Sequence, residues 1–151
     1  MKVFETLQEV ADQVGQELAI SEWITITQER IHLFAQATGD HQWIHVDPQR
    51  ASQGPFGTTI AHGFLTLSLM PTFFDSAMKI NQTRMAINYG VNKVRFTSPV
   101  PVGSKLRARI TLKSAEPIEP NGFQMTYSVL VEREGSDKPV CVAETIARRY
   151  G

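Results

Sequence analysis

The sequence has few of the features that mark secreted, membrane-spanning or nucleic-acid-binding proteins. Its 151 residues include one cysteine, Cys141, so no disulfide can form within the chain, and we expect a reducing compartment. The chain does not open with the charged and then apolar segments of a secretory signal. Lys and Arg number 15, as do Asp and Glu, so the basic surface that nucleic-acid binding needs is not expected. These absences predict a cytoplasmic protein whose partners include neither nucleic acid nor a membrane.

Long apolar runs are also scarce. The one candidate, residues 60–78, contains His62, Pro71 and Asp75 and is barely long enough to cross a bilayer. Its apolar residues point in nearly every direction around a helix, which predicts a core helix buried on all sides. Repeats are absent, and 42% hydrophobic and 20% charged residues are typical of a globular protein. We therefore predict a single domain spanning residues 1–151.

Capping residues indicate helices in the first half of the chain. Residues 4–13 are expected to form a short helix, and residues 23–25 belong to an expected strand. Thr27 can cap a following helix, whose inward face is Ile31, Phe34 and Ala35, and Gly39 can end that helix in a left-handed conformation.

A second helix start follows closely. Asp47 can cap a helix that has Pro48 in its first turn. Residues 40–46 are then a short loop between two helices.

The second half of the chain changes to a two-residue period. Alternation from Met85 to Val91 indicates a strand, and its slip at residues 90–93 indicates a bulge. Two further strands have one apolar face each, and residues 140–147 form a weaker one; the apolar sets are Leu106, Ala108, Ile110 and Leu112, then Phe123, Met125, Tyr127, Val129 and Val131. Because no helices separate these strands, we predict an antiparallel sheet whose apolar face is covered by the core helix.

Polar residues suited to proton transfer gather at the predicted helix ends. Asp40 and His45 flank the short loop, where they can hold one water between two proton carriers. Gly63 opens the core helix, where free N–H groups can stabilise a developing oxyanion. The residues alone also allow a purely structural role for Asp40 and His45, whereas Asp47 is best explained as a cap. Asp40, His41, His45 and Asp47 match no zinc or iron spacing, so no metal is expected.

Three separated segments carry a family resemblance. Residues 37–48 (ATGDHQWIHVDP) and 61–69 (AHGFLTLSL) resemble the hydratase motif of the MaoC-like (R)-specific enoyl-CoA hydratases, nearest the branch of nodulation protein N. Residues 88–96 (NYGVNKVRF) and the turn at 99–103 (PVPVG) extend the resemblance over most of the chain.

The resemblance implies an α+β hot-dog fold, in which an antiparallel sheet wraps a long central helix, and a homodimer with the acyl tunnel near its interface. It implies reversible syn hydration of a trans-2-enoyl-CoA to an (R)-3-hydroxyacyl-CoA, with no cofactor besides the coenzyme A of the substrate. Asp40 and His45 would hold the reacting water, and the amide of Gly63 would bind the thioester oxygen.

Further substrate contacts are expected around this centre. Gln42 and Trp43 stand where many members have Asn-Pro, and Trp43 either narrows the acyl pocket or packs structurally. His62 and Asn88 belong to the matching motifs and are expected to contact substrate. Basic residues must meet the coenzyme A phosphates, and the candidates are Lys93, Arg95, Lys105 and Arg107.

Two other functions remain open at this stage. Some relatives with the hot-dog fold are acyl-CoA thioesterases, which would release free thiol. A degenerate site would instead give a non-catalytic acyl-CoA-binding protein, although the Asp40, His45 and Gly63 set argues against it.

Overall fold

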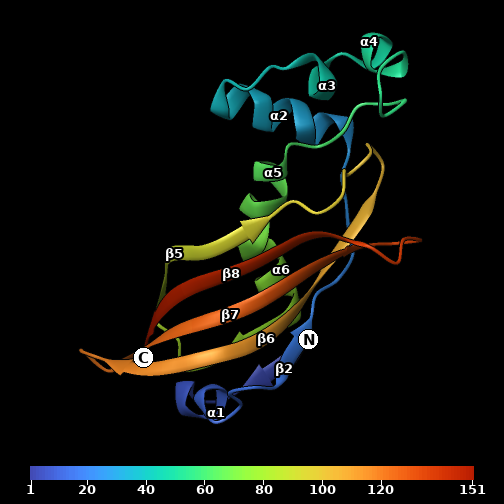
Figure 1. Cartoon of the computed structure of the whole chain (residues 1–151). Coiled ribbons are helices and arrows are strands. Elements are labelled where there is room, and N and C mark those ends of the chain that lie inside the picture. The colour runs from blue at the N-terminus through green and yellow to red at the C-terminus, as the bar shows by residue number, and fades with distance from the viewer.

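The computed structural model describes the whole chain, residues 1–151, and is dominated by a six-stranded sheet (Figure 1). The strands follow the order β2-β6-β7-β8-β5, with β3 also pairing with β6, and every neighbouring pair is antiparallel, as predicted. Their bounds are β2 Glu17–Ile20, β3 Ile24–Thr25, β5 Met85–Arg95, β6 Lys105–Ile118, β7 Gly122–Arg133 and β8 Pro139–Tyr150. A separate parallel pair joins β1 (Lys2–Phe4) to β4 (Met78–Ile80).

Six short helices complete the chain. Two of them, α5 (Gly63–Ser68) and α6 (Met70–Ala77), run along one face of the sheet, whereas three others extend beyond one end of it (Figure 1). Those three are α2 (Gln28–Thr38), α3 (Trp43–Val46) and α4 (Pro48–Ser52). At the opposite end lies α1 (Leu7–Ala11). No helix is long and apolar enough to span a membrane.

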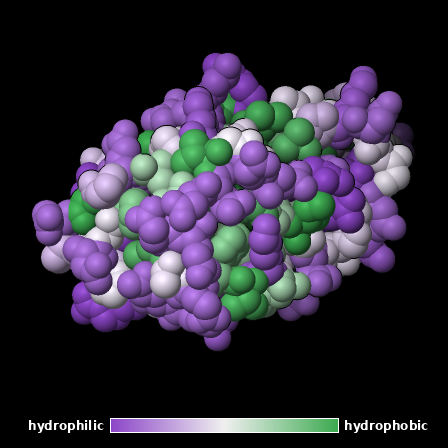
Figure 2. All heavy atoms as spheres, turned by 90° about the horizontal axis from the view of Figure 1, so that it is seen from below, coloured by the Kyte–Doolittle hydropathy of each residue, from purple (hydrophilic) through white to green (hydrophobic).

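The core forms where the sheet meets α5 and α6. The alternating residues predicted for β6 and β7 lie on this face, and all but the partly buried Phe123 are inaccessible to solvent or nearly so. Phe73 of α6 is also fully buried against them. Viewed from below, the outer surface is mostly hydrophilic, with apolar atoms in separate patches (Figure 2). The two-residue period therefore predicted the dry face of these strands correctly.

The central helix differs from its prediction in two ways. It is interrupted at Leu69, because Pro71 has no N–H to donate to the preceding turn, so two helices replace one. It is also not buried on all sides, since the side chain of Phe64 is 66% exposed. Only one side of α5 faces the sheet, and Phe64 on the other side is covered only in part, by the ring of Phe96.

Strand β5 has the predicted period and two register shifts, between Asn88 and Gly90 and between Val91 and Lys93. The direction of its side chains is less expected. Ala86 pairs with Arg149 and faces the helices, whereas Ile87 pairs with Arg148 on the outer face of the sheet. Met85, Ile87 and Tyr89 therefore point away from the core, whereas Val91 and Val94, further along the strand, face the helices and the core.

The helix ends at the top of the molecule follow the predicted caps. Thr27 accepts from the Arg30 amide, Gly39 has φ 80°, and Asp47 accepts from the Arg50 amide. Two shorter-range predictions were wrong. Residues 4–13 contain part of β1 and only a five-residue helix, because Thr6 caps α1. Residues 40–46 contain the single turn α3 rather than loop alone.

Candidate active site

Asp40 is placed by the end of α2. The left-handed Gly39 lets the chain turn sharply there, and its N–H donates to the carbonyl of Ala35 at 2.8 Å. The next residue, Asp40, is exposed, and its carboxylate accepts a 3.3 Å hydrogen bond from the amide of Gln42. This bond leaves the rest of the carboxylate free for other partners.

His45 is held by contacts on both its ring and its backbone. The ring nitrogen Nδ1 donates to the carbonyl oxygen of Ile60 at 2.7 Å, so Nδ1 carries the proton in the neutral ring and Nε2 is the acceptor. The backbone carbonyl of His45 accepts from Gln28 at 2.8 Å, and Gln28 in turn accepts from the Thr59 hydroxyl. The tautomer that can take a proton from water at Nε2 is therefore fixed by the fold.

His62 lies beside this ring. The two imidazoles stack with centroids 3.9 Å apart, and Nε2 of His62 donates to the backbone carbonyl of Asp40 at 3.0 Å. Its Nδ1 is buried and has no protein partner. Burial and the neighbouring His45 lower the pKa of His62, which outweighs the opposite effect of the Asp40 carbonyl. His62 is therefore a neutral ring near pH 7.

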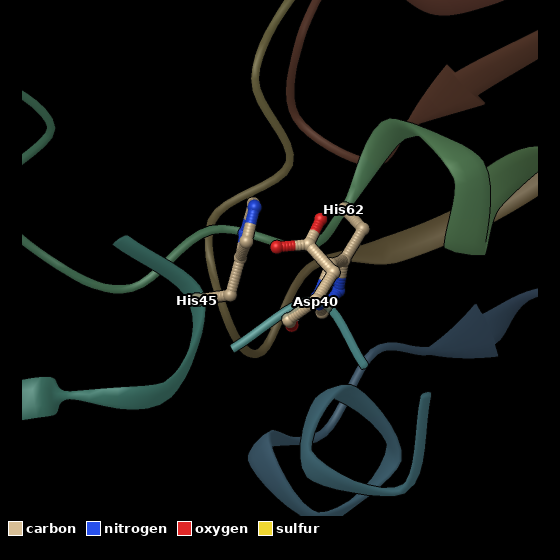
Figure 3. A group of neighbouring side chains, drawn as sticks. All are labelled: Asp40, His45 and His62. Carbon is tan, nitrogen blue, oxygen red and sulfur yellow. The ribbon is translucent and has the colours of Figure 1, made fainter. Parts of the chain in front are cut away.

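The three side chains converge from different elements (Figure 3). A carboxylate oxygen of Asp40 and one ring nitrogen each of His45 and His62 lie within 4.8 Å of one another. One water can bridge polar atoms at such separations with ordinary hydrogen bonds. The predicted Asp40 and His45 pair is brought together, and His62 completes the cluster.

Gly63 is the first residue of α5, directly after His62. The first amides of a helix have no partner within it, and the side chain of His62 does not cap them. A Cβ atom at Gly63 would lie 2.5 Å from Cδ2 of Phe96, so only glycine fits beneath that ring. The free amide end of α5 thus lies next to the histidine cluster, and Phe96 covers it.

A cavity of about 630 Å³ lies between α5, α6 and the β5 and β8 strands. Leu67, one helical turn after Gly63, lines it, as does Asn88 of β5. Asn88 therefore faces a space of the size that organic ligands fill.

The predicted contacts around the loop are placed differently. Trp43 packs under the guanidinium of Arg50, 4.4 Å from its ring centroid, and against Gly54, which has no room for a side chain. The side chain of Gln42 is exposed and makes no hydrogen bond. Neither side chain is brought into the cluster of Asp40, His45 and His62.

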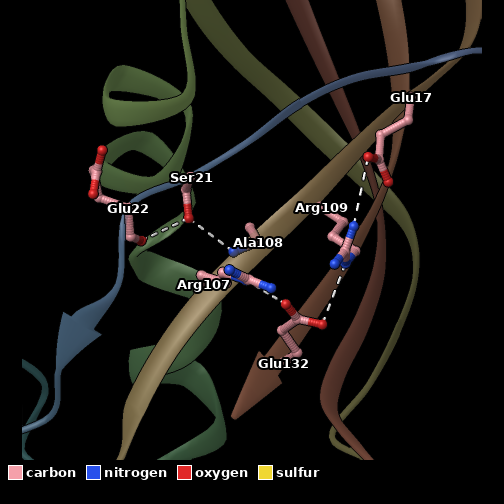
Figure 4. Close-up of polar contacts among 7 residues, drawn as sticks. All are labelled: Glu17, Ser21, Glu22, Arg107, Ala108, Arg109 and Glu132. Atoms are coloured by element: carbon pink, nitrogen blue, oxygen red, sulfur yellow. Dashed lines mark hydrogen bonds and ion pairs between the residues drawn. The ribbon is translucent and has the colours of Figure 1, made fainter. Parts of the chain in front are cut away.

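Four basic residues were candidates for phosphate contacts. Arg107 bonds to Glu132 and Lys105 lies 4.0 Å from Glu134, so both have partners on the sheet (Figure 4 shows Arg107). Lys93 and Arg95 are exposed near the end of β5, and Arg95 directly precedes Phe96. Of the four, only Lys93 and Arg95 lie close in sequence to Phe96, whose ring lies over Gly63.

Glu132 connects two arginines on the outer face of the sheet. It accepts hydrogen bonds from Arg107 and Arg109, and Arg109 also pairs with Glu17 at 3.6 Å (Figure 4). Burial acts to raise the pKa of Glu132, but the two hydrogen bonds prevail and lower it. This network stabilises the sheet and is separate from the histidine cluster.

Two other polar side chains near the helices and the sheet are structural. The hydroxyl of Ser68 donates to the carbonyl of Phe64 in its own helix. Burial raises the pKa of the Cys141 thiol to about 11, so it stays protonated and unreactive.

Sequence reasoning missed the residues that orient the site. Gln28, Thr59 and Ile60 hold His45 although they are remote from it in sequence, and no short motif marks them. Arg149, which lines the cavity, was not singled out either. A signal existed there, because Arg149 is an even number of residues along β8 from the buried Cys141 and Ala143, so its side chain lies on the same face of the strand.

Comparison with known proteins gives consistent relatives. Residues 9–134 match the family described as MaoC like domain. The chain is 54% identical over 148 residues to 3-hydroxyacyl-thioester dehydratase Z of Mycobacterium tuberculosis, covering 98% of both. It is 48% identical over 143 residues to nodulation protein N of Rhizobium leguminosarum, covering 93% of this chain and 89% of that protein.

Solved structures agree with the predicted hot-dog fold. An R-hydratase from Pseudomonas aeruginosa, in its unliganded form, superposes with a TM-score of 0.69 at 26% identity, covering 91% of this chain and 81% of that one. A monoamine oxidase regulatory protein from Archaeoglobus gives a TM-score of 0.79 at 24% identity, covering 99% and 97%. The α+β hot-dog prediction is confirmed.

Proposed function

The chain belongs to the MaoC-like domain family, and we propose that it is an (R)-specific enoyl-CoA hydratase. The reaction adds water across a trans-2-enoyl-CoA to give an (R)-3-hydroxyacyl-CoA, and its reverse is the dehydration named in its mycobacterial relative. The observation that carries the proposal is the meeting of the Asp40 carboxylate with the His45 imidazole, next to the amide end of α5.

The geometry supports one reacting water at the Asp40 and His45 pair and an oxyanion donor at Gly63. One water lies between Asp40 and Nε2 of His45, and its oxygen attacks C3 of the substrate while a proton is delivered to C2. Attack at C3 moves negative charge onto the thioester oxygen, where the Gly63 N–H donates a hydrogen bond. One such donor contributes about 10²- to 10³-fold in rate. Asp40 and His45 act on the same water, so they form one catalytic unit.

The substrate brings coenzyme A as part of itself. We assign its phosphates to Lys93 and Arg95, the two cations of the original four without a carboxylate partner within 4.0 Å. Addition of water causes no net oxidation or reduction of the substrate, so the proposed reaction uses no redox cofactor. His62 and Asn88 are assigned to the substrate side of the site, and a cytoplasmic location belongs to the same proposal.

We also propose that the protein is a homodimer formed through β5. This strand is at the sheet edge and pairs only with β8, so half of its backbone groups have no partner. Met85, Ile87 and Tyr89 on its outer face are 43–53% exposed, and Phe64 and Phe96 are exposed nearby. A second copy related by a twofold axis would cover all of these residues.

The test of the catalytic assignment uses two near-isosteric variants. Asp40→Asn and His45→Gln are each expected to lower kcat for a short enoyl-CoA by about 10³-fold or more, with little change in melting temperature. The double variant is expected to be little worse than either single one. Chiral analysis of the product and a thiol-release assay accompany the measurement. Full activity in either variant, or thiol release without hydration, would contradict the assignment.

A further inference from the structure

The cavity behind α5 and α6 has two unlike walls. The helices contribute mostly apolar side chains, with Ser68 and Asp75 as the exceptions, whereas the sheet adds several polar side chains among small and apolar ones. The apolar helix residues are Leu67, Met70, Pro71 and Phe74, and the polar sheet residues are Asn88, Tyr127, Thr145 and Arg149. A pocket for a plain hydrocarbon chain is expected to be apolar on every side. The polar wall therefore indicates an occupant with a polar group of its own.

The polar wall follows from the register of β8. Cys141 and Ala143 are buried on the face of β8 that meets the helices. Arg149 is an even number of residues further along the strand, so it lies on the same face. On the β5 side its neighbours are small, since Ala86 lies opposite it on β5 and Ala147 precedes it in the alternation, whereas the larger Phe123 lies opposite it on β7. The small residues on the β5 side of this long cation leave the space that forms the cavity.

Arg149 is held in place but lacks a counter-ion. Its Nε donates to the hydroxyl of Tyr127 at 3.0 Å, and that hydroxyl donates to the sulfur of Met125. Tyr127 is itself 1% exposed, with its ring against Phe74. No carboxylate lies within 4.0 Å of Arg149, in contrast to Arg107 and Arg109, and its terminal Nη groups have no protein partner. A positioned, partly buried guanidinium of this kind favours a carboxylate, which it can bind through two parallel hydrogen bonds.

We propose that this cavity binds acyl chains that end in a carboxylate, and that Arg149, positioned by Tyr127, binds that carboxylate. The substrate class would be the coenzyme A thioesters of dicarboxylic acids. The inference rests on the proposed function for the position of the thioester at Gly63. The cavity runs from Leu67, one helical turn after Gly63, to Phe74 of the next helix, which packs on Tyr127, so the second carboxylate stands many carbon atoms from the thioester.

The carboxylate of Asp75 is expected to weaken the binding of a second carboxylate in the cavity. It also lines the cavity, but it is exposed, so solvent screens its repulsion of a bound carboxylate. Removing its charge should strengthen the binding of a dicarboxylic acyl chain, whereas removing the charge of Arg149 should weaken it.

The experiment compares the binding of two saturated thioesters by calorimetry. One is the coenzyme A monothioester of a straight-chain dicarboxylic acid, and the other is the monocarboxylic acyl-CoA of equal length, measured over a series of lengths. At the optimal length, the wild-type protein is expected to bind the dicarboxylic thioester about 10-fold more tightly or better. Saturated chains cannot be hydrated, so this result does not depend on catalysis.

Three variants complete the design. Arg149→Gln is expected to abolish the preference, and Asp75→Asn to increase it. Arg148→Gln is the matched control: Arg148 is the neighbouring arginine, on the outer face of the sheet over Tyr89, and its loss should leave the preference unchanged. Thermal unfolding checks that each variant is folded.

The outcomes separate this proposal from the proposed function. Equal binding of the two thioesters, no binding of either, or a preference that persists in Arg149→Gln or falls in Asp75→Asn overturns the carboxylate site. Hydration of a short enoyl-CoA, whose chain does not reach Arg149, is measured separately. If hydration fails while the Arg149-dependent preference is present, the catalytic proposal alone is wrong.

Discussion

The imidazole of His45 owes its orientation to groups from other parts of the chain. A main-chain carbonyl holds its Nδ1, and Gln28 holds its backbone. With Nδ1 protonated, Nε2 of the neutral ring is an acceptor for a water proton. The carbonyl of Ile60, which takes no proton itself, can thus decide which ring nitrogen of His45 accepts the proton of the water.

The fit of Gly63 beneath Phe96 gives a prediction at the residue scale. In Gly63→Ala the new methyl group would lie 2.5 Å from the ring of Phe96, so either the ring or the start of α5 must move. We expect kcat to fall at least about 10-fold, because a displaced amide no longer meets the thioester oxygen. Steady-state kinetics test this, and thermal unfolding checks that the variant is folded. Unchanged kcat in Gly63→Ala would exclude Gly63 as the oxyanion donor.

The lowered pKa of His62 predicts a dependence of stability on pH. The unfolded chain takes up a proton at this histidine near its ordinary pKa of about 6.5, whereas the folded protein does so only at lower pH. The free energy of unfolding should therefore decrease as pH falls below about 6.5, until the folded pKa is reached. Urea unfolding at several pH values should show a smaller decrease in His62→Asn. The exposed His32→Asn, at a histidine that does not act on the pKa of His62, serves as control, and an equal effect in both variants would contradict the assignment.

Single residues also show what the sequence could reveal about the site. Asp40 and His45 were predictable because both sit at helix ends that capping residues identify. The stacking of His62 on His45 was not, because it joins residues 17 positions apart through the folding of the chain between them. The two-residue alternation along β8 could have predicted that Arg149 points inward. An arginine near the end of the chain is, however, ordinarily assumed to be solvated.

Helices and strands were predicted well where local chemistry determines them. Thr27, Gly39 and Asp47 mark their helix ends through contacts within four residues. The break at Leu69 was within reach, since Pro71 is visible in the sequence, whereas the exposure of Phe64 was not. The helical pattern shows on which sides of a helix the apolar residues lie. It does not show whether the surface that packs against each side belongs to the same chain. The same applies to β5, whose alternation fixed a period without saying which face is inside.

The cap of α4 provides a prediction at the scale of an element. Asp47 accepts a hydrogen bond from the amide of Arg50 at 3.1 Å, so Asp47→Ala should lower the free energy of unfolding by about 1 kcal/mol. Asp47→Ser, which keeps a capping oxygen, should recover most of this loss. Chemical denaturation measures both. Enzyme activity should remain close to wild type, and a loss as large as in Asp40→Asn would place Asp47 in the chemistry instead.

The whole molecule leaves an apolar strand edge uncovered, which predicts its assembly state. In Ile87→Lys a charge replaces an apolar residue on the outer face of β5, and we expect the proposed dimer to dissociate. Analytical ultracentrifugation measures this. Val14→Lys, a change at an exposed apolar residue far from β5 in sequence, should leave the dimer intact. A wild-type monomer, or a dimer that survives Ile87→Lys unchanged, would exclude β5 as the interface.

The polar cluster and the sheet come from separate stretches of the chain. All three members of the cluster fall between residues 40 and 62, in the segment that extends beyond the end of the sheet (Figure 1). The strands that make up the scaffold contribute none of them. Chemistry and architecture can therefore diverge independently: a redesigned segment of some two dozen residues would give the same sheet a new reactivity, while its strands kept their registers.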